Sequence, residues 1–245
     1  MRSAVFTEYG RPEVLQIQQV DKPVPRDDQV LIKVHATTVT TAECLMRRGC
    51  PRWGRVIIGL WRPRKRMRVM GLELAGTASL AHKPANTTFE QAAAAVDGAT
   101  TALFFLRTKV GLASGQSLGA DKVIDYTVAD FTRGDQAYDV IFDTVGRSSL
   151  RRCRRVLATN GRYIATTGLR NAVLAPVTSL LGGRRVITGM SADKRESLPI
   201  VREMVESGRL RVVVDRSYPF EQLVQAHHYV DQGHKTGNVT VLVAS

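Results

Sequence analysis

The chain has 245 residues, of which 44% are hydrophobic and 23% charged, and lysine plus arginine exceed aspartate plus glutamate by 13. These values match ordinary globular domains and predict one large or two modest domains with a hydrophobic core. No apolar run reaches the roughly 20 residues of a transmembrane helix, which excludes a membrane-spanning protein, and the positive charge should attract anions such as phosphates, nucleotides or nucleic acid.

Cysteine usage and the first residues bear on the cellular compartment. The three cysteines, Cys44, Cys50 and Cys153, form an odd set without metal-type spacing, which argues against a disulfide framework and suits a reducing compartment. Arg2 and Glu8 interrupt the few apolar residues at the start, a pattern unlike a secretory signal. We therefore expect a cytoplasmic protein.

The N-terminal region predicts an antiparallel, barrel-like domain. Apolar and polar residues alternate over 3–7, 14–20 and 29–36, with proline-rich and aspartate-rich turns between these segments. A short helix is expected over 41–48, with Thr40 or Thr41 as its N-cap and Gly49 as its stop.

The middle of the chain predicts α/β winding. After a strand over 69–78 and helices over 89–96 and 98–110, buried strand patterns alternate with helix patterns, which indicates parallel β-α-β units. The expected strands are 123–126, 140–144, 162–166 and 186–190, and the expected helices are 148–158 and 197–207. A strand over 211–214, a helix over 221–231 and a closing strand over 238–243 follow.

Two arginine-rich clusters supply much of the positive charge. One is the run 62–68, and the other comprises Arg151, Arg152, Arg154 and Arg155 on the predicted helix 148–158. No aromatic residue interleaves with these charges to stack on bases. A solvated face is therefore favoured over a nucleic-acid patch for both clusters.

Six segments, in order along the chain, resemble the medium-chain dehydrogenase/reductase superfamily, in its zinc-independent quinone oxidoreductase and enoyl reductase-like branch. The segments are residues 4–15, 30–36, 71–76 (GLELAG), 83–94, 118–126 (LGADKVIDY) and 234–239. The resemblance implies an α/β fold with two domains. Residues 1–98 and 215–245 would form a GroES-like β-barrel-type substrate domain, and residues 99–214 a Rossmann-like doubly wound parallel sheet that binds the nucleotide.

The resemblance breaks at two junctions, near residues 78 and 116. The first lacks several strands of the substrate domain. The second lacks the first β-α-β unit of the nucleotide-binding sheet, including the glycine-rich turn and the helix N-terminus that hold a pyrophosphate. In a sheet of order 3-2-1-4-5-6, strands 123–126 and 140–144 must then pair directly or leave backbone groups unpaired. We expect weak or absent dinucleotide binding.

The resemblance implies an NAD(P)H-dependent oxidoreductase that transfers hydride from the nicotinamide, usually of NADPH, to a quinone, enone or related carbonyl compound. Thr40 resembles the polar residue that lies near nicotinamide and substrate, which makes it the candidate catalytic residue; a helix cap is the alternative. Thr40 and Leu72 also stand where zinc-dependent relatives place a cysteine and a histidine, so no metal is expected.

Cofactor-binding candidates follow the predicted strands 140–144, 162–166 and 186–190, at the carboxyl ends where open α/β sheets bind ligands, or belong to the closing segment. They are Thr144, Val145, Gly146, Thr167, Gly168, Met190, Ser191, Lys235, Gly237 and Asn238. Plain turn glycines and a solvated closing turn are the alternatives.

Two functions stay open at this point. One is the reductase, acting on a small-molecule substrate, with a homodimer as its family-typical state and no membrane partner. The other is a non-catalytic member of the family, a degenerate paralogue or an incomplete gene product, that binds anions or nucleic acid through its arginines.

Overall fold

The computed structural model describes residues 1–27, 31–70, 81–110, 122–125, 127–166, 169–189 and 194–243. It divides the chain into two compact units, unit 1 (Met1–Thr100 and Asp193–Ser245) and unit 2 (Thr101–Ala192), and each is described by itself. The strands are β1 (Arg2–Phe6), β2 (Leu15–Gln19), β3 (Ala36–Val39), β4 (Tyr138–Asp143), β5 (Leu157–Ala165), β6 (Arg185–Ile187), β7 (Val214–Pro219) and β8 (Asn238–Leu242). The α-helices are α1 (Thr41–Arg48), α2 (Arg55–Ile58), α3 (Phe89–Leu103), α4 (Leu150–Cys153), α5 (Leu169–Leu181), α6 (Ser197–Glu206) and α7 (Leu223–Asp231).

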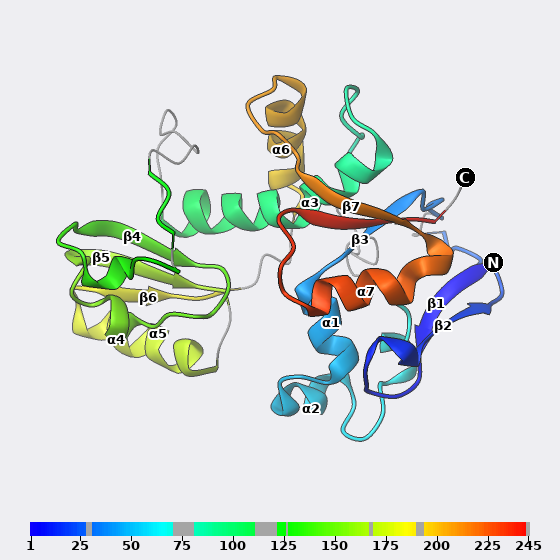
Figure 1. The fold of residues 1–245 in the computed structure, drawn as a ribbon, viewed down its shortest axis with the longest axis horizontal. Helices are drawn as coiled ribbons and strands as arrows, with labels where there is room; N and C mark the ends of the chain where they lie inside the picture. The colour runs from blue at the N-terminus through cyan, green and yellow to red at the C-terminus, as the bar shows by residue number, and fades with distance from the viewer. Residues whose placement is uncertain are drawn as a thin grey trace. The chain divides into compact units, whose positions relative to one another are not determined.

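Unit 1 contains two small sheets. β1 and β2 pair antiparallel, whereas β8 lies between β3, which is antiparallel to it, and β7, which is parallel to it. α7 lies between α1 and the β7–β8 pair (Figure 1). Buried residues of these elements form one core, which includes Phe6, Val39, Val239 and Val241. The antiparallel pair 2–6 with 15–19 and the helix 41–48 agree with the sequence prediction.

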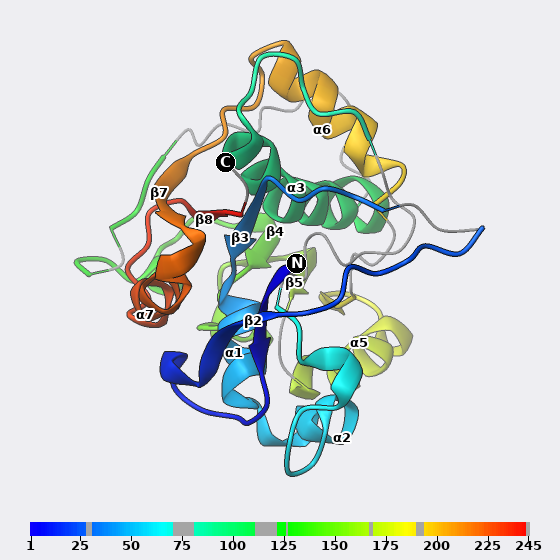
Figure 2. The same ribbon diagram turned by 90° about the vertical axis from the view of Figure 1, so that its right-hand side faces the viewer.

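α6 lies beside α3 in both views of unit 1 (Figures 1 and 2). Lys194 Nζ, just before α6, is 3.0 Å from Asp97 Oδ1 of α3. Asn86 Nδ2 donates to the carbonyl oxygen of Val205 at 3.2 Å, which ties the approach to α3 to the last turn of α6. These polar contacts fix the position of α6 within unit 1.

Unit 2 is built on a parallel sheet of order β4-β5-β6. Because side chains alternate along a strand, Tyr163 and Ala165 of β5 pack on one face, against the side of α4 and α5, and Ile164 packs on the other. That second face is covered by Phe105 and Val110 of the helical segment that follows α3. The mixed α/β fold with a parallel sheet is confirmed.

The expected strand at 123–126 is wrong for its described part. Residues 122–125 pair with no strand of the described residues, and Val123 is 86% exposed. In a 3-2-1-4-5-6 sheet this strand would pair with strand 2, which belongs to the β-α-β unit that the sequence is expected to lack. Without a neighbour, a strand has no ladder hydrogen bonds to stabilise it.

Other boundaries also differ from the prediction. The expected helices 89–96 and 98–110 are one helix, α3, continued by a π-helical segment over Phe104–Lys109. Gly98 does not end it, because glycine in a helix costs only about 1 kcal/mol and is tolerated. The expected helix 148–158 is cut to α4, because β5 already begins at Leu157, which pairs with Tyr138.

Candidate functional site

Thr40, the predicted catalytic residue, is the N-cap of α1. Its Oγ1 accepts a hydrogen bond from the Glu43 backbone N–H at 3.1 Å, and the Glu43 carboxylate accepts from the Thr40 backbone N–H at 3.0 Å. This reciprocal pair is a capping box, and Gly49 ends the helix in the left-handed region with φ of 63°. The expected cap is therefore present, and the catalytic role of Thr40 stays a prediction.

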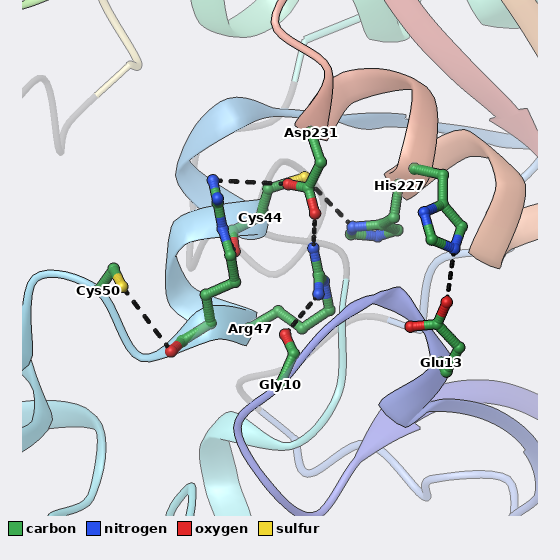
Figure 3. Close-up of polar contacts among 9 residues, drawn as sticks. Gly10, Glu13, Cys44, Arg47, Cys50, His227 and Asp231 are labelled. Atoms are coloured by element: carbon green, nitrogen blue, oxygen red, sulfur yellow. Dashed lines mark hydrogen bonds and ion pairs between the residues drawn. The ribbon is translucent and has the colours of Figure 1, made fainter.

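A buried polar cluster joins α1 to α7 (Figure 3). Cys44 Sγ lies 3.3 Å from His227 Nδ1, and the Arg47 guanidinium binds the Asp231 carboxylate. Burial, and secondarily the charge of Arg47, lower the pKa of His227 to about 3. Burial raises the pKa of the Cys44 thiol to about 12, so this pair is a neutral imidazole beside a protonated thiol and not an activated nucleophile.

A cavity of about 710 Å³ adjoins this cluster in unit 1. Its wall is mostly apolar, and Glu43 and His227 are the polar side chains that the α1–α7 cluster and its cap contribute to it. Thr40 is not among the described residues that line this cavity, but its capping-box partner Glu43 is.

The closing segment with Lys235, Gly237 and Asn238 is a turn held against β7. The Asp215 carboxylate accepts from the Thr236 backbone N–H and from Tyr229 Oη, both at 2.9 Å, and these bonds lower the pKa of Asp215. A Cβ on Gly237 would lie 2.8 Å from the carbonyl oxygen of Val213, so only glycine fits there. The sequence prediction did not include Asp215, which organises this turn.

The loop after β4 carries Thr144, Val145 and Gly146, all exposed at the carboxyl end of the strand. The Asp143 carboxylate accepts from the backbone N–H groups of Val145, Gly146 and Ser148 at 3.2, 2.7 and 2.9 Å. It also accepts from Tyr163 Oη at 2.7 Å.

Burial alone would raise the pKa of Asp143, but the Tyr163 and backbone hydrogen bonds lower it below its usual value. The carboxylate is therefore ionised at neutral pH. Asp143 is the second organising residue that the sequence prediction missed, although an aspartate directly before a Thr-Val-Gly turn is a signal for such a loop.

Four of the predicted cofactor residues, Thr167, Gly168, Met190 and Ser191, lie outside the described residues. The others fall into two groups. Thr144, Val145 and Gly146 share one loop of unit 2. In unit 1, Lys235 and Gly237 precede β8, and Asn238 is its first residue. Because Val39 of β3 pairs with Val239 of β8 in an antiparallel register, Thr40 lies beside Asn238.

The loop after β4 does not fit the phosphates of a dinucleotide. Phosphates are bound by backbone N–H groups that point at the ligand, commonly at a glycine-rich turn and a helix N-terminus. Three N–H groups of this loop instead point at the Asp143 carboxylate, whose charge would repel a phosphate. Thr144 and Val145 could contact an uncharged part of a cofactor at this edge.

The described residues offer neither a metal cluster nor a membrane-spanning helix. Residues 1–27, 31–70, 81–110, 122–125, 127–166, 169–189 and 194–243 contain no group of three or more histidine, cysteine, aspartate or glutamate side chains placed to hold a metal ion. Among the same residues, no helix has the length and apolar character needed to cross a membrane.

Comparison with known proteins gives consistent matches. The sequence model of the family described as zinc-binding dehydrogenase matches residues 118–241. An NADPH-dependent alkenal/one oxidoreductase, chloroplastic, of Arabidopsis thaliana is 34% identical over 128 residues, which are 51% of this chain and 30% of that protein. The chain thus spans about a third of the length of the first curated relatives that it matches.

Two further matches extend over the whole chain. Quinone oxidoreductase of Rattus norvegicus is 24% identical and covers 99% of this chain and 97% of its own length. That alignment has 325 positions, 80 more than this chain has residues. The solved structure of the quinone oxidoreductase from Coxiella burnetii has a TM-score of 0.76 at 18% identity and covers 100% of this chain and 99% of its own, which shows the shared fold.

The family match covers half of the chain, and the relatives and the fold agree with it. The chain belongs to the zinc-binding dehydrogenase family and, within the medium-chain dehydrogenase/reductase superfamily, to the quinone oxidoreductase-like branch.

Proposed function

We propose that this chain is an NAD(P)H-dependent oxidoreductase of the quinone oxidoreductase type, with NADPH as hydride donor and a quinone, enone or related carbonyl compound as acceptor. The observation that carries the proposal is the parallel β4-β5-β6 sheet with the exposed Thr144–Gly146 loop at its carboxyl edge. Open α/β sheets bind their ligands at this edge. The relatives named as NADPH-dependent and quinone oxidoreductases support the same function.

The bound cofactor would supply a hydride, and the chain's own residues would orient the reactants and stabilise charge on the substrate oxygen. Thr40 is the residue proposed for the second task. Its Oγ1 contacts the Glu43 carboxylate at 3.4 Å, a long distance for an O–H···O bond. This hydrogen bond is weak, so the hydroxyl proton would be able to turn from Glu43 to a carbonyl oxygen of the substrate.

We further propose that dinucleotide binding is weak. The Asp143 carboxylate occupies three backbone N–H groups of the one cofactor loop that can be described in unit 2. The rat relative also has many positions without a counterpart in this chain. Both observations favour a high dissociation constant for NADPH.

The reductase function is tested by the oxidation of millimolar NADPH, measured as the loss of its absorbance at 340 nm. A quinone and a 2-alkenal serve as acceptors, and Thr40→Val, which removes the hydroxyl at nearly constant volume, is the matched variant. We expect acceptor-dependent oxidation by the parent chain and a lower rate for the variant. Oxidation no faster than in buffer with every acceptor would reject the function.

The second candidate function is a non-catalytic family member that binds anions through its arginines. Unit 2 favours it, because Thr101–Ala192 holds 13 lysines and arginines against six aspartates and no glutamate.

We also propose a cytoplasmic location and a homodimer formed at the β6 edge of the sheet. Sedimentation at several concentrations checks the dimer.

A further inference from the structure

The arginine cluster at 151–155 is split by α4 and the turn after it into two faces. Arg152 Nη2 lies 2.8 Å from Asp130 Oδ2, and Arg155 Nη2 lies 3.6 Å from Asp135 Oδ1. Arg151 and Arg154, three residues apart and thus on one face, have no ion pair or hydrogen bond with any residue that can be described. The described residues therefore neutralise only Arg152 and Arg155 of this cluster.

Arg151 and Arg154 line a pocket of about 550 Å³ in unit 2, together with Arg170 and Arg184. Arg184 is fixed there, because its Nε donates to the carbonyl oxygen of Leu157 at 2.7 Å. None of the described residues that line the pocket is an aspartate or glutamate. Four arginines therefore line one hollow, and the described residues of its wall supply no acidic counter-charge.

The rest of the wall is a mixture of apolar and polar groups. Leu150, Leu174 and Leu181 contribute apolar surface, and Ser149 and Thr159 contribute hydroxyls. The volume is in the range of small-molecule sites, which combine an apolar lining with a few polar groups. Arginine forks bind phosphate and carboxylate oxygens in bidentate geometry.

We propose that this pocket, between α4, α5 and the loop into β6, binds a small organic anion with two negative charges and an apolar body, such as an aryl phosphate ester. Like charges held around one hollow repel, and a bound dianion would relieve this repulsion. A nucleic acid is disfavoured, because no aromatic side chain lines the pocket among the residues that the structure describes.

This site differs from the predicted cofactor site and does not depend on the reductase function. None of Thr144, Val145 or Gly146 lines the pocket. A chain that does not oxidise NADPH can still bind the anion. A chain that oxidises NADPH can also lack the anion site. The two proposals therefore fail separately.

Calorimetric titration of the full chain at low salt tests the site with three probes: 1-naphthyl phosphate, inorganic phosphate and 1-naphthol. We expect the first to bind tighter than the other two, because only it carries both charge and apolar surface. The double variant Arg151→Ala/Arg154→Ala should weaken its binding by about tenfold or more, since two charge-assisted contacts are lost. Both side chains are exposed, so the variant should fold, and its circular dichroism verifies this.

The matched control is Arg107→Ala/Arg147→Ala, which removes two exposed arginines of unit 2 outside the pocket. We expect its affinity for 1-naphthyl phosphate to stay within about twofold, since exposed charges at a distance are screened. If both double variants lost the same affinity for 1-naphthyl phosphate, the binding would come from general charge attraction, and the proposed site would be wrong. Absence of binding at millimolar 1-naphthyl phosphate would overturn it too, as would tighter binding of a single-stranded oligonucleotide that both double variants weaken.

Discussion

Arg47 and Asp231 form an ion pair that joins α1 to α7, with 2.5 Å between Nη2 and Oδ2 and a separation of 184 positions in the sequence. The Arg47 side chain is fully buried, and that of Asp231 is 18% exposed. Arg47 Nη1 also donates to the carbonyl oxygen of Gly10 at 2.6 Å. One arginine therefore connects three segments of unit 1, as Figure 3 shows.

Replacing Arg47 by methionine should strongly destabilise the protein. The change leaves Asp231 without its buried partner, and breaking such a pair costs about 3 to 5 kcal/mol. Urea unfolding followed by circular dichroism at pH 7 measures the effect. Arg48→Met is the control: Arg48 lies 3.5 Å from Asp231 but is 40% exposed, so it should cost less than about 1 kcal/mol. Equal costs for the two variants would contradict the structural role of Arg47.

His227 should make stability depend on pH. Its pKa in the folded protein is about 3, below the ordinary value of 6.5, so the unfolded state binds the proton more readily between these values. The free energy of unfolding should fall as the pH drops from about 6.5 toward 3, with a contribution of up to about 1.4 kcal/mol per pH unit from this group. His227→Gln should remove that contribution. His228→Gln, on the exposed side of α7, should keep it, and an unchanged slope in His227→Gln would refute the assignment.

The hydrogen bonds of Asp143 should stabilise the loop after β4 and contribute to the free energy of unfolding. In Asp143→Asn the neutral amide offers one acceptor oxygen in place of two, so at least one backbone N–H loses its partner, at a cost of about 1 to 3 kcal/mol. Tyr163→Phe removes one hydrogen bond and keeps the other three, so it should cost about 1 kcal/mol. Urea unfolding compares the two. The order would be reversed if Tyr163, and not the loop, were the main partner of Asp143.

The cysteines should differ in reactivity. Cys44 and Cys153 are buried and Cys50 is exposed, and the raised pKa of Cys44 disfavours its thiolate. Ellman's reagent should therefore modify one thiol per native chain and three per unfolded chain. Cys50→Ser should abolish the native reaction. Rapid modification that persists in this variant would show that Cys44 or Cys153 is open to solvent.

Substitutions at Thr40 distinguish its role as the N-cap of α1 from a role in catalysis. Thr40→Ala should cost about 1 kcal/mol of stability, whereas Thr40→Asn, also a good cap, should restore it. If the hydroxyl donates to substrate, both variants should lower acceptor reduction at saturating NADPH, and Thr40→Ser should retain it. Turnover that follows stability alone would leave Thr40 as a cap without a catalytic role.

The sequence predicted local features well. The helix 41–48 with its Thr40 cap and Gly49 stop followed from short-range chemistry, as did the β1–β2 alternation. The strand at 123–126 could not be predicted correctly from its own pattern, because a strand requires a neighbour and 122–125 have none among the described residues. The burial of Arg47 was equally invisible, since its partner lies near the other end of the chain.

In the candidate site, too, local features were predicted and contacts between residues far apart in the sequence were missed. The resemblance indicated the loop at 144–146 and the turn at 235–238, and the structure describes both as turns. Asp143 and Asp215, which organise them through bonds to distant tyrosines, were missed. The run at 151–155 was predicted as a solvated face. In the structure, Arg152 and Arg155 form ion pairs with aspartates, and these pairs distinguish their side of the run from the side of Arg151 and Arg154.

Titration of NADPH against the purified chain, followed by nicotinamide fluorescence, tests whether this protein binds a dinucleotide weakly. We expect a dissociation constant well above the micromolar range, because the loop that could meet the phosphates donates its N–H groups to Asp143. A sub-micromolar dissociation constant would contradict it, since such affinity requires an intact phosphate-binding turn.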